Sequence, residues 1–101
     1  MAQVKWTLQS AEDAESIAQF ISKDSGKYAR LQIERFLEQI RILEKHPFAG
    51  RIVPKLNIKS IRELIVGSYR IIYKIIDEDN IDIITIHHSA RRIKKSMLKR
   101  R

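Results

Sequence analysis

The sequence contains no cysteine, so disulfides and thiolate metal sites are excluded. A chain without cysteine fits a reducing compartment, and we expect a cytoplasmic protein. Its apolar runs are short, and none reaches the roughly 18 to 20 residues that span a bilayer. Residues 1–16 also lack the basic start and apolar core of a signal peptide. We therefore expect no association with a membrane.

The sequence also lacks the common motifs of enzymes. It has no nucleophile elbow, P-loop or dinucleotide fingerprint. The histidines are His46, His87 and His88, and the last two are neighbours whose side chains point to opposite faces of a strand. The acidic residues at 77–79 form a polar turn. We therefore expect no metal and no cofactor.

Positive charge is concentrated at one end of the chain. The net charge is +8, and seven of the 20 basic residues lie in residues 91–101, which contain no acid. The other 13 basic residues are nearly balanced by 12 acidic ones. We predict a single domain over residues 1–90 and a basic tail over 91–101. Such a tail favours polyanions or acidic partner surfaces, or it is a solvated chain end.

Hydrophobic periodicity predicts a strand followed by two helices in the first half. Alternating residues indicate a half-buried strand over residues 3–8. Apolar residues at helical spacing indicate a helix over about 11–23 and a longer one over about 27–45. Ser10, followed by Asp13, is typical of a capping box at the start of the first helix. The short break between the stripes predicts a helical hairpin.

The second half predicts an irregular segment and then three strands. The residue before Pro47 avoids the helical region, which ends the second helix at His46. Residues 47–60 hold both prolines of the chain and read as irregular. Gly67-Ser68 is a two-residue turn of the II′ type. The predicted strands cover about residues 60–66, 69–77 and 81–88.

These elements predict an α+β fold. An N-terminal strand and a helical hairpin precede a three-stranded antiparallel meander, and the helices pack on one face of the sheet. Either edge of the sheet can accept the first strand. Neither face of any strand is wholly polar, so both faces need cover. We expect the face without helices to be partly open and to expose an apolar patch for a partner.

Ribonuclease chemistry remains possible without a metal. RNA supplies its own 2′-OH nucleophile, so cleavage needs an acid, a base and cations at the phosphate. Groups of these kinds occur at Arg51, Arg62, Arg70, Tyr73, His87, His88, Arg91 and Arg92. In the alternative interpretation, Arg62–Glu63 and Arg70 form ion pairs within the sheet, and the tyrosines are half-buried core residues.

An ordered set of short motifs resembles the ParE/RelE superfamily of bacterial toxins from type II toxin–antitoxin systems. The motifs are "GR" at 50–51 with Pro54 after it, "IREL" at 61–64, "SYRIIY" at 68–73 and "IDIITIHHSARR" at 81–92. The resemblance spans nearly the whole chain and agrees with the predicted order of elements. It implies a toxin that inhibits growth when free. A cognate antitoxin would neutralise it by laying its C-terminal segment across the toxin surface.

Two activities occur among the toxins that the sequence resembles. RelE-like members cut mRNA on the ribosome, and here Arg70 matches an arginine that such members use at the phosphate. Arg91 or Arg92 matches the later basic position, and His87 or His88 would act as acid or base. ParE-like members inhibit DNA gyrase and are not known for a hydrolytic site.

The "IREL" strand decides between these activities. RelE has lysines there, whereas this chain has Ile61 and Glu63 near those positions. Glu63 would repel a phosphate unless Arg62 or Arg70 neutralised it, and the tail lacks the tyrosine that RelE has. We therefore interpret the chain as closer to ParE and as a binding protein rather than an enzyme. The alternatives are a ribosome-dependent endoribonuclease and a non-toxic RNA-binding module.

The ParE-like interpretation implies a set of residues that are structural or face the target or the antitoxin. The basic tail would bind gyrase or an acidic segment of the antitoxin. The expected contact residues are Arg51, Arg62, Tyr69, Arg70, Tyr73, Arg91, Arg92, Lys94 and Lys95.

Overall fold

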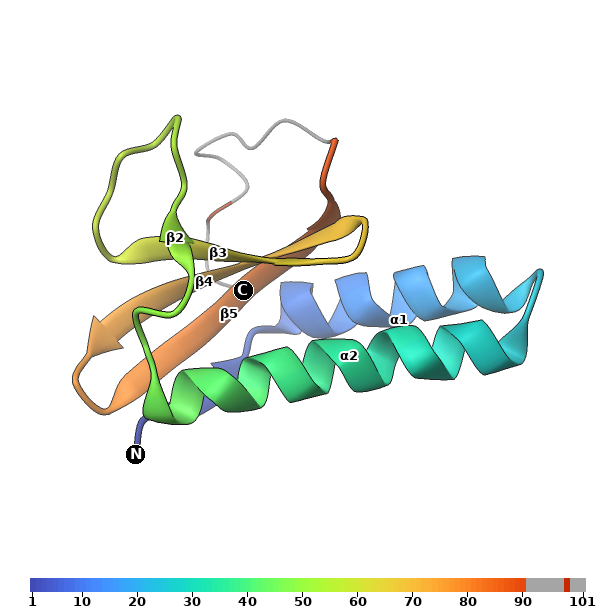
Figure 1. Ribbon diagram of the computed structural model, residues 1–101, viewed down its shortest axis with the longest axis horizontal. Helices are drawn as coiled ribbons and strands as arrows, with labels where there is room; N and C mark the ends of the chain where they lie inside the picture. The colour runs from blue at the N-terminus through green and yellow to red at the C-terminus, as the bar shows by residue number, and fades with distance from the viewer. Residues whose placement is uncertain (91–97, 99–101) are drawn as a thin grey trace.

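A computed structural model describes residues 1–90 and Leu98 of the chain. The elements in chain order are β1 (Gln3–Trp6), α1 (Leu8–Ser22), α2 (Gly26–Lys45), β2 (Arg51–Ile52), β3 (Ile61–Val66), β4 (Tyr69–Asp77) and β5 (Asn80–His88). Both helices lie on one face of the sheet, as Figure 1 shows. The predicted α+β class and order of elements are confirmed.

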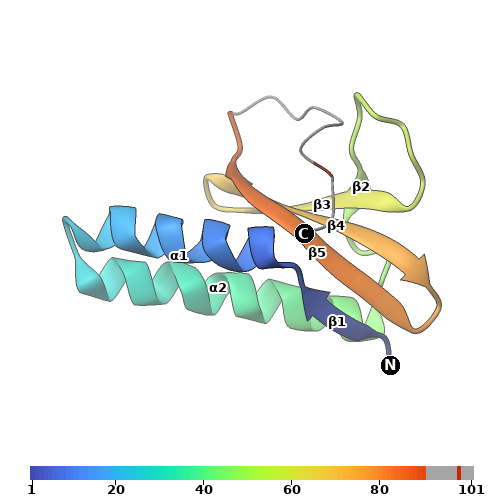
Figure 2. The ribbon, with the colours of Figure 1, turned by 180° about the vertical axis from the view of Figure 1, so that it is seen from behind.

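The sheet has five strands in the order β1-β5-β4-β3-β2. The meander β3-β4-β5 is antiparallel as predicted, and Gly67 has φ +61 at the tight turn between β3 and β4. β1 runs parallel to β5 and forms one edge, which Figure 2 shows from behind. The two-residue strand β2 forms the other edge beside β3, within a segment that we expected to be irregular. The sequence hid β2 because two residues carry no periodic signal.

The start of α1 differs from the prediction. The helix begins at Leu8, and its N-cap is Thr7 rather than Ser10. The Thr7 hydroxyl accepts a hydrogen bond from the Ser10 backbone N–H at 3.2 Å. It also lies 2.7 Å from the Ile83 carbonyl oxygen of β5. One threonine therefore ends β1, caps α1 and attaches both to the central sheet.

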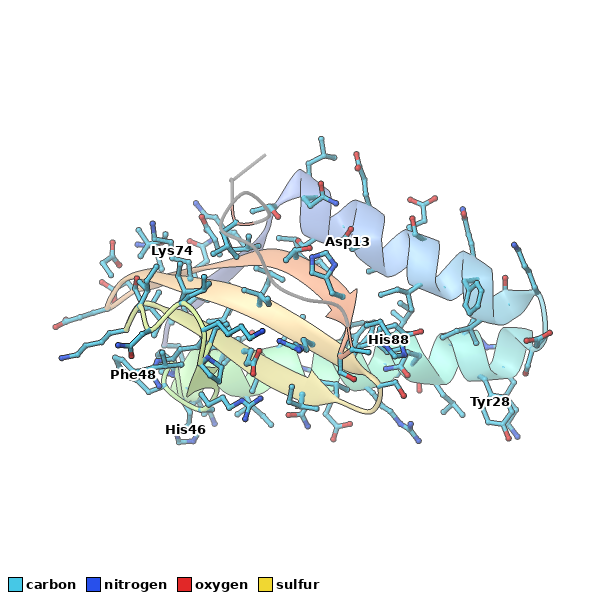
Figure 3. All side chains as sticks on the ribbon, turned by 90° about the horizontal axis from the view of Figure 1, so that it is seen from above. Asp13, Tyr28, His46, Phe48, Lys74 and His88 are labelled. Carbon is cyan, nitrogen blue, oxygen red and sulfur yellow. The ribbon has the colours of Figure 1, made fainter. Side chains whose placement is uncertain are left out.

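Asp13 has a different role from the predicted capping box. β1 ends beside Ile83, so the following residues of β5 face α1 across the sheet edge. The Asp13 carboxylate accepts hydrogen bonds from the Thr85 hydroxyl at 2.5 Å and the Ile86 backbone N–H at 3.0 Å. Figure 3 shows Asp13 on the side of α1 that adjoins β5. Asp13 thus satisfies the Thr85 hydroxyl and the Ile86 N–H on the edge of β5 that continues beyond the end of β1.

The main core lies between the helical hairpin and the sheet. Phe36 and Leu43 of α2 pack with Ile71 and Ile83 of the sheet, and all four side chains are fully buried. The partly buried Ile17 of α1 packs against the same cluster. The apolar stripes of both helices thus face the sheet, as their spacing predicts.

The opposite face is more covered than we expected. Val53, Ile61 and Ile72 form a second buried cluster there. Leu56, Ile58 and Leu98 pack against that cluster. Residues 53–58 lie between β2 and β3, so the irregular segment covers sheet surface that the sequence left open. Part of this face is therefore covered by the chain itself, which is compatible with the expectation of a face that is partly open.

Candidate functional site

The charged residues on the sheet face away from the helices gather around Glu63. Its side chain is fully buried, and its two carboxylate oxygens contact different arginines. Arg51 Nε donates to Oε2 at 2.6 Å, and an Arg70 terminal nitrogen donates to Oε1 at 3.3 Å. A buried carboxylate is unfavourable unless it is paired and hydrogen-bonded, and these two contacts provide that compensation.

Arg70 also binds the backbone that follows β5. Its Nε and second terminal nitrogen donate to the Ser89 carbonyl oxygen at 3.0 and 2.6 Å. The Ser89 backbone N–H donates to the Ser68 carbonyl oxygen at 2.7 Å. We call Arg51, Glu63, Arg70 and Ser89 the charged cluster. All three nitrogens of the Arg70 guanidinium take part in these contacts, which fixes its orientation toward Glu63 and Ser89.

Arg51 and Arg70 border a small hollow on this face. Its volume is about 150 Å³, and Val53, Pro54 and Lys55 complete the lining. The Arg51 side chain is 64% exposed, whereas that of Arg70 is 21% exposed. Two arginines and one carboxylate leave an excess of positive charge here, to which Lys55 adds. The hollow therefore suits an acidic group of a partner better than a basic one.

Arg62 lies apart from this cluster. Alternate residues of β3 point to opposite faces, so Arg62 and Glu63 diverge. Arg62 donates to the backbone carbonyls of Lys59 at 3.2 Å and Gly50 at 3.0 Å, and its guanidinium carbon lies 4.8 Å from the centre of the Phe48 ring. The Arg62–Glu63 ion pair of the alternative interpretation is therefore wrong, whereas Arg70, its other candidate for an ion pair, does contact Glu63, as does Arg51.

Tyr73 is fully buried on the helix side of the sheet. Its hydroxyl accepts a hydrogen bond from the Gly50 backbone N–H at 2.9 Å and donates one to the Pro47 carbonyl oxygen at 2.8 Å. Burial raises the pKa of the Tyr73 phenol above its ordinary value. We call Pro47, Gly50 and Tyr73 the tyrosine cluster. Its contacts attach the end of the helical hairpin to β4, so Tyr73 serves the fold.

Gly50 is a residue whose role the sequence motif did not reveal. A Cβ atom at this position would lie 2.6 Å from the Glu63 carbonyl oxygen and 2.8 Å from the Tyr73 ring and hydroxyl. Only glycine fits between β3 and Tyr73 without displacing one of them. The "GR" pair at 50–51 thus combines a residue of the tyrosine cluster with a residue of the charged cluster.

The two neighbouring histidines lie on opposite faces, as predicted. His87 pairs with Arg70 in the sheet register and His88 with Tyr69. His87 Nε2 lies 3.1 Å from the Thr85 hydroxyl, and the His88 ring meets the Tyr69 ring edge-on at 5.7 Å. Figure 3 shows His88 at the end of β5 that adjoins α1. The groove between α1 and the sheet is nevertheless lined by both histidines, together with Asp13 and Ser16.

Tyr69 and His88 border a groove of about 330 Å³ between α1 and the sheet. Ile17, Phe20 and Ile86 give it apolar walls. Phe20 is 67% exposed, which leaves a large apolar side chain at the rim. A groove of this kind fits an apolar side chain of a partner protein.

Two further predictions concern metals and membranes. Within residues 1–90 and Leu98, His, Asp and Glu side chains do not gather in a group of three that could hold a metal ion. Asp77 accepts hydrogen bonds from the Asp79 N–H and the Asn80 amide, and the Asp79 contact lowers the pKa of its carboxyl. Across the same described residues, no helix is long and apolar enough to cross a membrane.

The structure brings together Arg51 and Arg70 and separates them from Arg62, Tyr69 and Tyr73. The predicted tail residues Arg91, Arg92, Lys94 and Lys95 lie outside the described residues. Sequence reasoning missed the backbone contacts of Ser89 with Arg70 and Ser68. It also missed that Lys55 lines the hollow. Only the position of Ser89 just after a predicted strand could have pointed to its backbone.

Comparisons with known proteins give a family model, a related sequence and a solved structure with a similar fold. The model described as "ParE toxin of type II toxin-antitoxin system, parDE" matches residues 4–93. A curated protein of Sinorhizobium fredii (strain NBRC 101917 / NGR234), named "Putative toxin Y4kP", is 30% identical over 88 residues, which cover 85% of this chain and 86% of that protein. A solved structure titled "Chromosomal ParDE TA system from P. aeruginosa" has a similar fold. Its TM-score is 0.72 at 21% identity, with 87% of this chain and 96% of that chain covered.

Proposed function

The chain belongs to the ParE toxin family of type II toxin–antitoxin systems, and we propose that it inhibits DNA gyrase when it is free of antitoxin. A toxin of such a system has a cognate antitoxin as its partner. We further propose that both interactions take place in the cytoplasm, where gyrase acts on DNA. Family membership gives no support to the third alternative, a non-toxic RNA-binding module.

The hydrogen bonds that Arg70 donates are the observation on which this proposal rests. A ribonuclease needs a cation free to stabilise charge that develops on the phosphate. Here the Arg70 guanidinium donates to Glu63 and, twice, to Ser89. The buried Glu63 carboxylate adds negative charge where a phosphate would have to sit. This arrangement favours a protein that acts by binding over one that cuts RNA.

The surfaces proposed for partners differ in chemistry. The hollow beside Arg51 and Lys55 is cationic, and it lies on the same sheet face as Leu98. We propose that this face and the basic residues Arg91, Arg92, Lys94 and Lys95 contact gyrase or an acidic part of the antitoxin. The apolar groove near Phe20 and Tyr69 is a second candidate for the antitoxin.

The experiment measures both possible activities of the same chain, one in vitro and one in cells. The purified chain is added to gyrase and relaxed plasmid, and mRNA ends are mapped in cells that express the chain. We expect supercoiling to stop while mRNA stays intact, and we expect the antitoxin to restore supercoiling. Deletion of residues 91–101 should weaken inhibition at least tenfold. The control replaces Lys23 and Lys27, two exposed cations near the helical hairpin turn, by glutamine.

Codon-positioned mRNA cuts with normal supercoiling would overturn the gyrase proposal and support a ribosome-dependent endoribonuclease. Equal inhibition with and without residues 91–101 would remove the tail from the binding surface. A similar loss in the Lys23 and Lys27 control would show that total charge, rather than the tail, governs inhibition.

A further inference from the structure

The inference concerns the outer face of α2, the side of the helix that is turned to solvent. Figure 3 shows α2 along one side of the molecule, from Tyr28 near its start to His46 just after its end. Two acids and then two bases lie on this face at helical spacing, and all four are exposed: Glu34, Glu38, Arg41 and Lys45. We call these four residues the charge stripe. Its charge changes sign halfway along the stripe.

The charge stripe is not compensated within the chain. Glu34 and Glu38 lie one turn apart, and so do Arg41 and Lys45, so that residues at four-residue spacing repel each other. Among the residues that the structure describes, none forms an ion pair with these four side chains. Charges of both signs are therefore available to a partner, in two separate halves of one helix face.

Apolar surface lies on both flanks of the charge stripe. Leu37 and Ile42 are large apolar side chains, yet both are exposed. Helical geometry places them on opposite sides of the stripe. A groove of about 530 Å³ adjoins Ile42, and its lining includes Met1 and three residues of the charge stripe. Exposed apolar surface bordered by charges is typical of a contact between proteins.

We propose that the outer face of α2 binds a second copy of this chain, with the two α2 helices antiparallel about a two-fold axis at the middle of the charge stripe. Glu34 of each copy then lies level with Lys45 of the second copy. Glu38 lies level with Arg41 in the same way. The contact is isologous, because every acid of the stripe meets a base of the same stripe in the other copy.

A second copy suits this face better than a partner segment of one charge sign. An acidic or a basic segment would be repelled by half of the charge stripe, whereas an antiparallel copy satisfies both halves. Pairing through α2 also leaves the charged cluster uncovered, because that cluster lies on the sheet face away from the helices. One pair of helices buries less than a standard interface, so the dimer is weak. The inference goes beyond the proposed function and does not depend on gyrase.

The test reverses each half of the charge stripe separately. One variant combines Glu34→Lys with Glu38→Lys, and the other combines Arg41→Glu with Lys45→Glu. Each variant alone should raise the dissociation constant of the dimer at least tenfold in sedimentation velocity, because like charges then face each other. An equimolar mixture of the two variants should dimerise at least as well as the wild-type chain, since every level pair is again opposite in charge.

Two further variants separate this contact from general effects of charge. Glu15→Lys combined with Glu78→Lys changes the net charge by the same amount at exposed positions elsewhere. This control should leave the dissociation constant within about twofold of the wild-type value. Ile42→Gln removes apolar surface without a change in charge and should raise the constant about threefold. Circular dichroism checks that each variant keeps its helices.

Three outcomes would overturn the proposal. One is a wild-type chain that stays monomeric at the highest soluble concentration. Another is a mixture of the two reversed variants that fails to dimerise, since the two halves of the stripe then do not meet across a two-fold axis. The third is loss of antitoxin binding in both variants while dimerisation persists, which would assign this face to the antitoxin. Intact supercoiling in the presence of the wild-type chain would count against the gyrase proposal alone.

Discussion

The tyrosine cluster and the charged cluster attach the same segment to the sheet, but on opposite faces. Gly50 belongs to the first and Arg51 to the second, so two adjacent residues lead to different environments. The tyrosine cluster is neutral, and Tyr73 is fully buried. The charged cluster contains an arginine that is 64% exposed. The buried hydrogen bonds of the tyrosine cluster support the fold, whereas the exposed Arg51 side chain of the charged cluster remains available to a partner.

The two clusters should differ in their contribution to stability. A buried donor that loses its partner costs about 1–3 kcal/mol, because water does not replace the bond. An exposed arginine such as Arg51 is partly screened by water and salt, and water can replace it at the carboxylate once it is removed. Substitutions in the tyrosine cluster should therefore destabilise the protein more than substitutions of exposed residues in the charged cluster.

Gly50→Ala should have the largest effect. The added methyl group would lie 2.6 Å from the Glu63 carbonyl oxygen, which is backbone and cannot easily move away. We expect a loss of about 3 kcal/mol in the free energy of unfolding, measured by urea denaturation. Gly26→Ala is the control, since its nearest atom is a flexible Arg30 nitrogen at 3.7 Å. Equal stability of the two variants would contradict the close approach of Gly50 to Tyr73.

Tyr73→Phe should have the next largest effect. The substitution keeps the ring but removes the acceptor for the Gly50 N–H and the donor to the Pro47 carbonyl. We expect a loss of about 2 kcal/mol in the free energy of unfolding, because a buried N–H is left without its partner. Tyr28→Phe is the matched control, as Tyr28 is 66% exposed.

The pH dependence of the same variant tests the burial of the phenol. Burial raises the pKa of Tyr73 above the ordinary value of 10.0, so the unfolded chain releases this proton first as pH rises. The stabilising contribution is then fully present below pH 10 and is lost as pH rises through the folded-state pKa. Between pH 10.0 and the folded-state pKa, wild-type stability should fall more steeply than that of Tyr73→Phe, by at most about 1.4 kcal/mol per pH unit. Parallel curves would show that the phenol is not held neutral.

The contrast also explains what the sequence could and could not predict. Periodicity alone predicted the helical hairpin, the meander and the opposite faces of His87 and His88, because local spacing decides each of them. The partners of Glu63 depend on how β2 pairs with β3, which places Arg51 opposite Glu63. A two-residue strand gives no periodic signal, so the sequence pointed to Arg62 or Arg70 as partners of Glu63 and missed Arg51.

The errors at the start of α1 have the same origin. Thr7 caps the helix because its hydroxyl also reaches the Ile83 carbonyl, and that contact exists only once β1 lies beside β5. Asp13 faces Thr85 and Ile86 for the same reason. The sequence contained a capping pattern at Ser10 and Asp13, but Thr7 takes the N-cap position and accepts from the Ser10 N–H, while Asp13 contacts β5.

Arg51→Ala should have the smallest effect on stability. Its guanidinium is largely exposed, and Arg70 still contacts the other oxygen of Glu63 after the substitution. We expect a loss of about 1 kcal/mol in the free energy of unfolding, because Oε2 of the buried Glu63 loses its partner but removal of the exposed Arg51 side chain lets water reach it. Comparison with Tyr73→Phe in the same denaturation series tests the distinction between the clusters. If Arg51→Ala costs as much as Tyr73→Phe, the charged cluster supports the fold to the same degree, and the division between a stabilising face and a partner face does not hold.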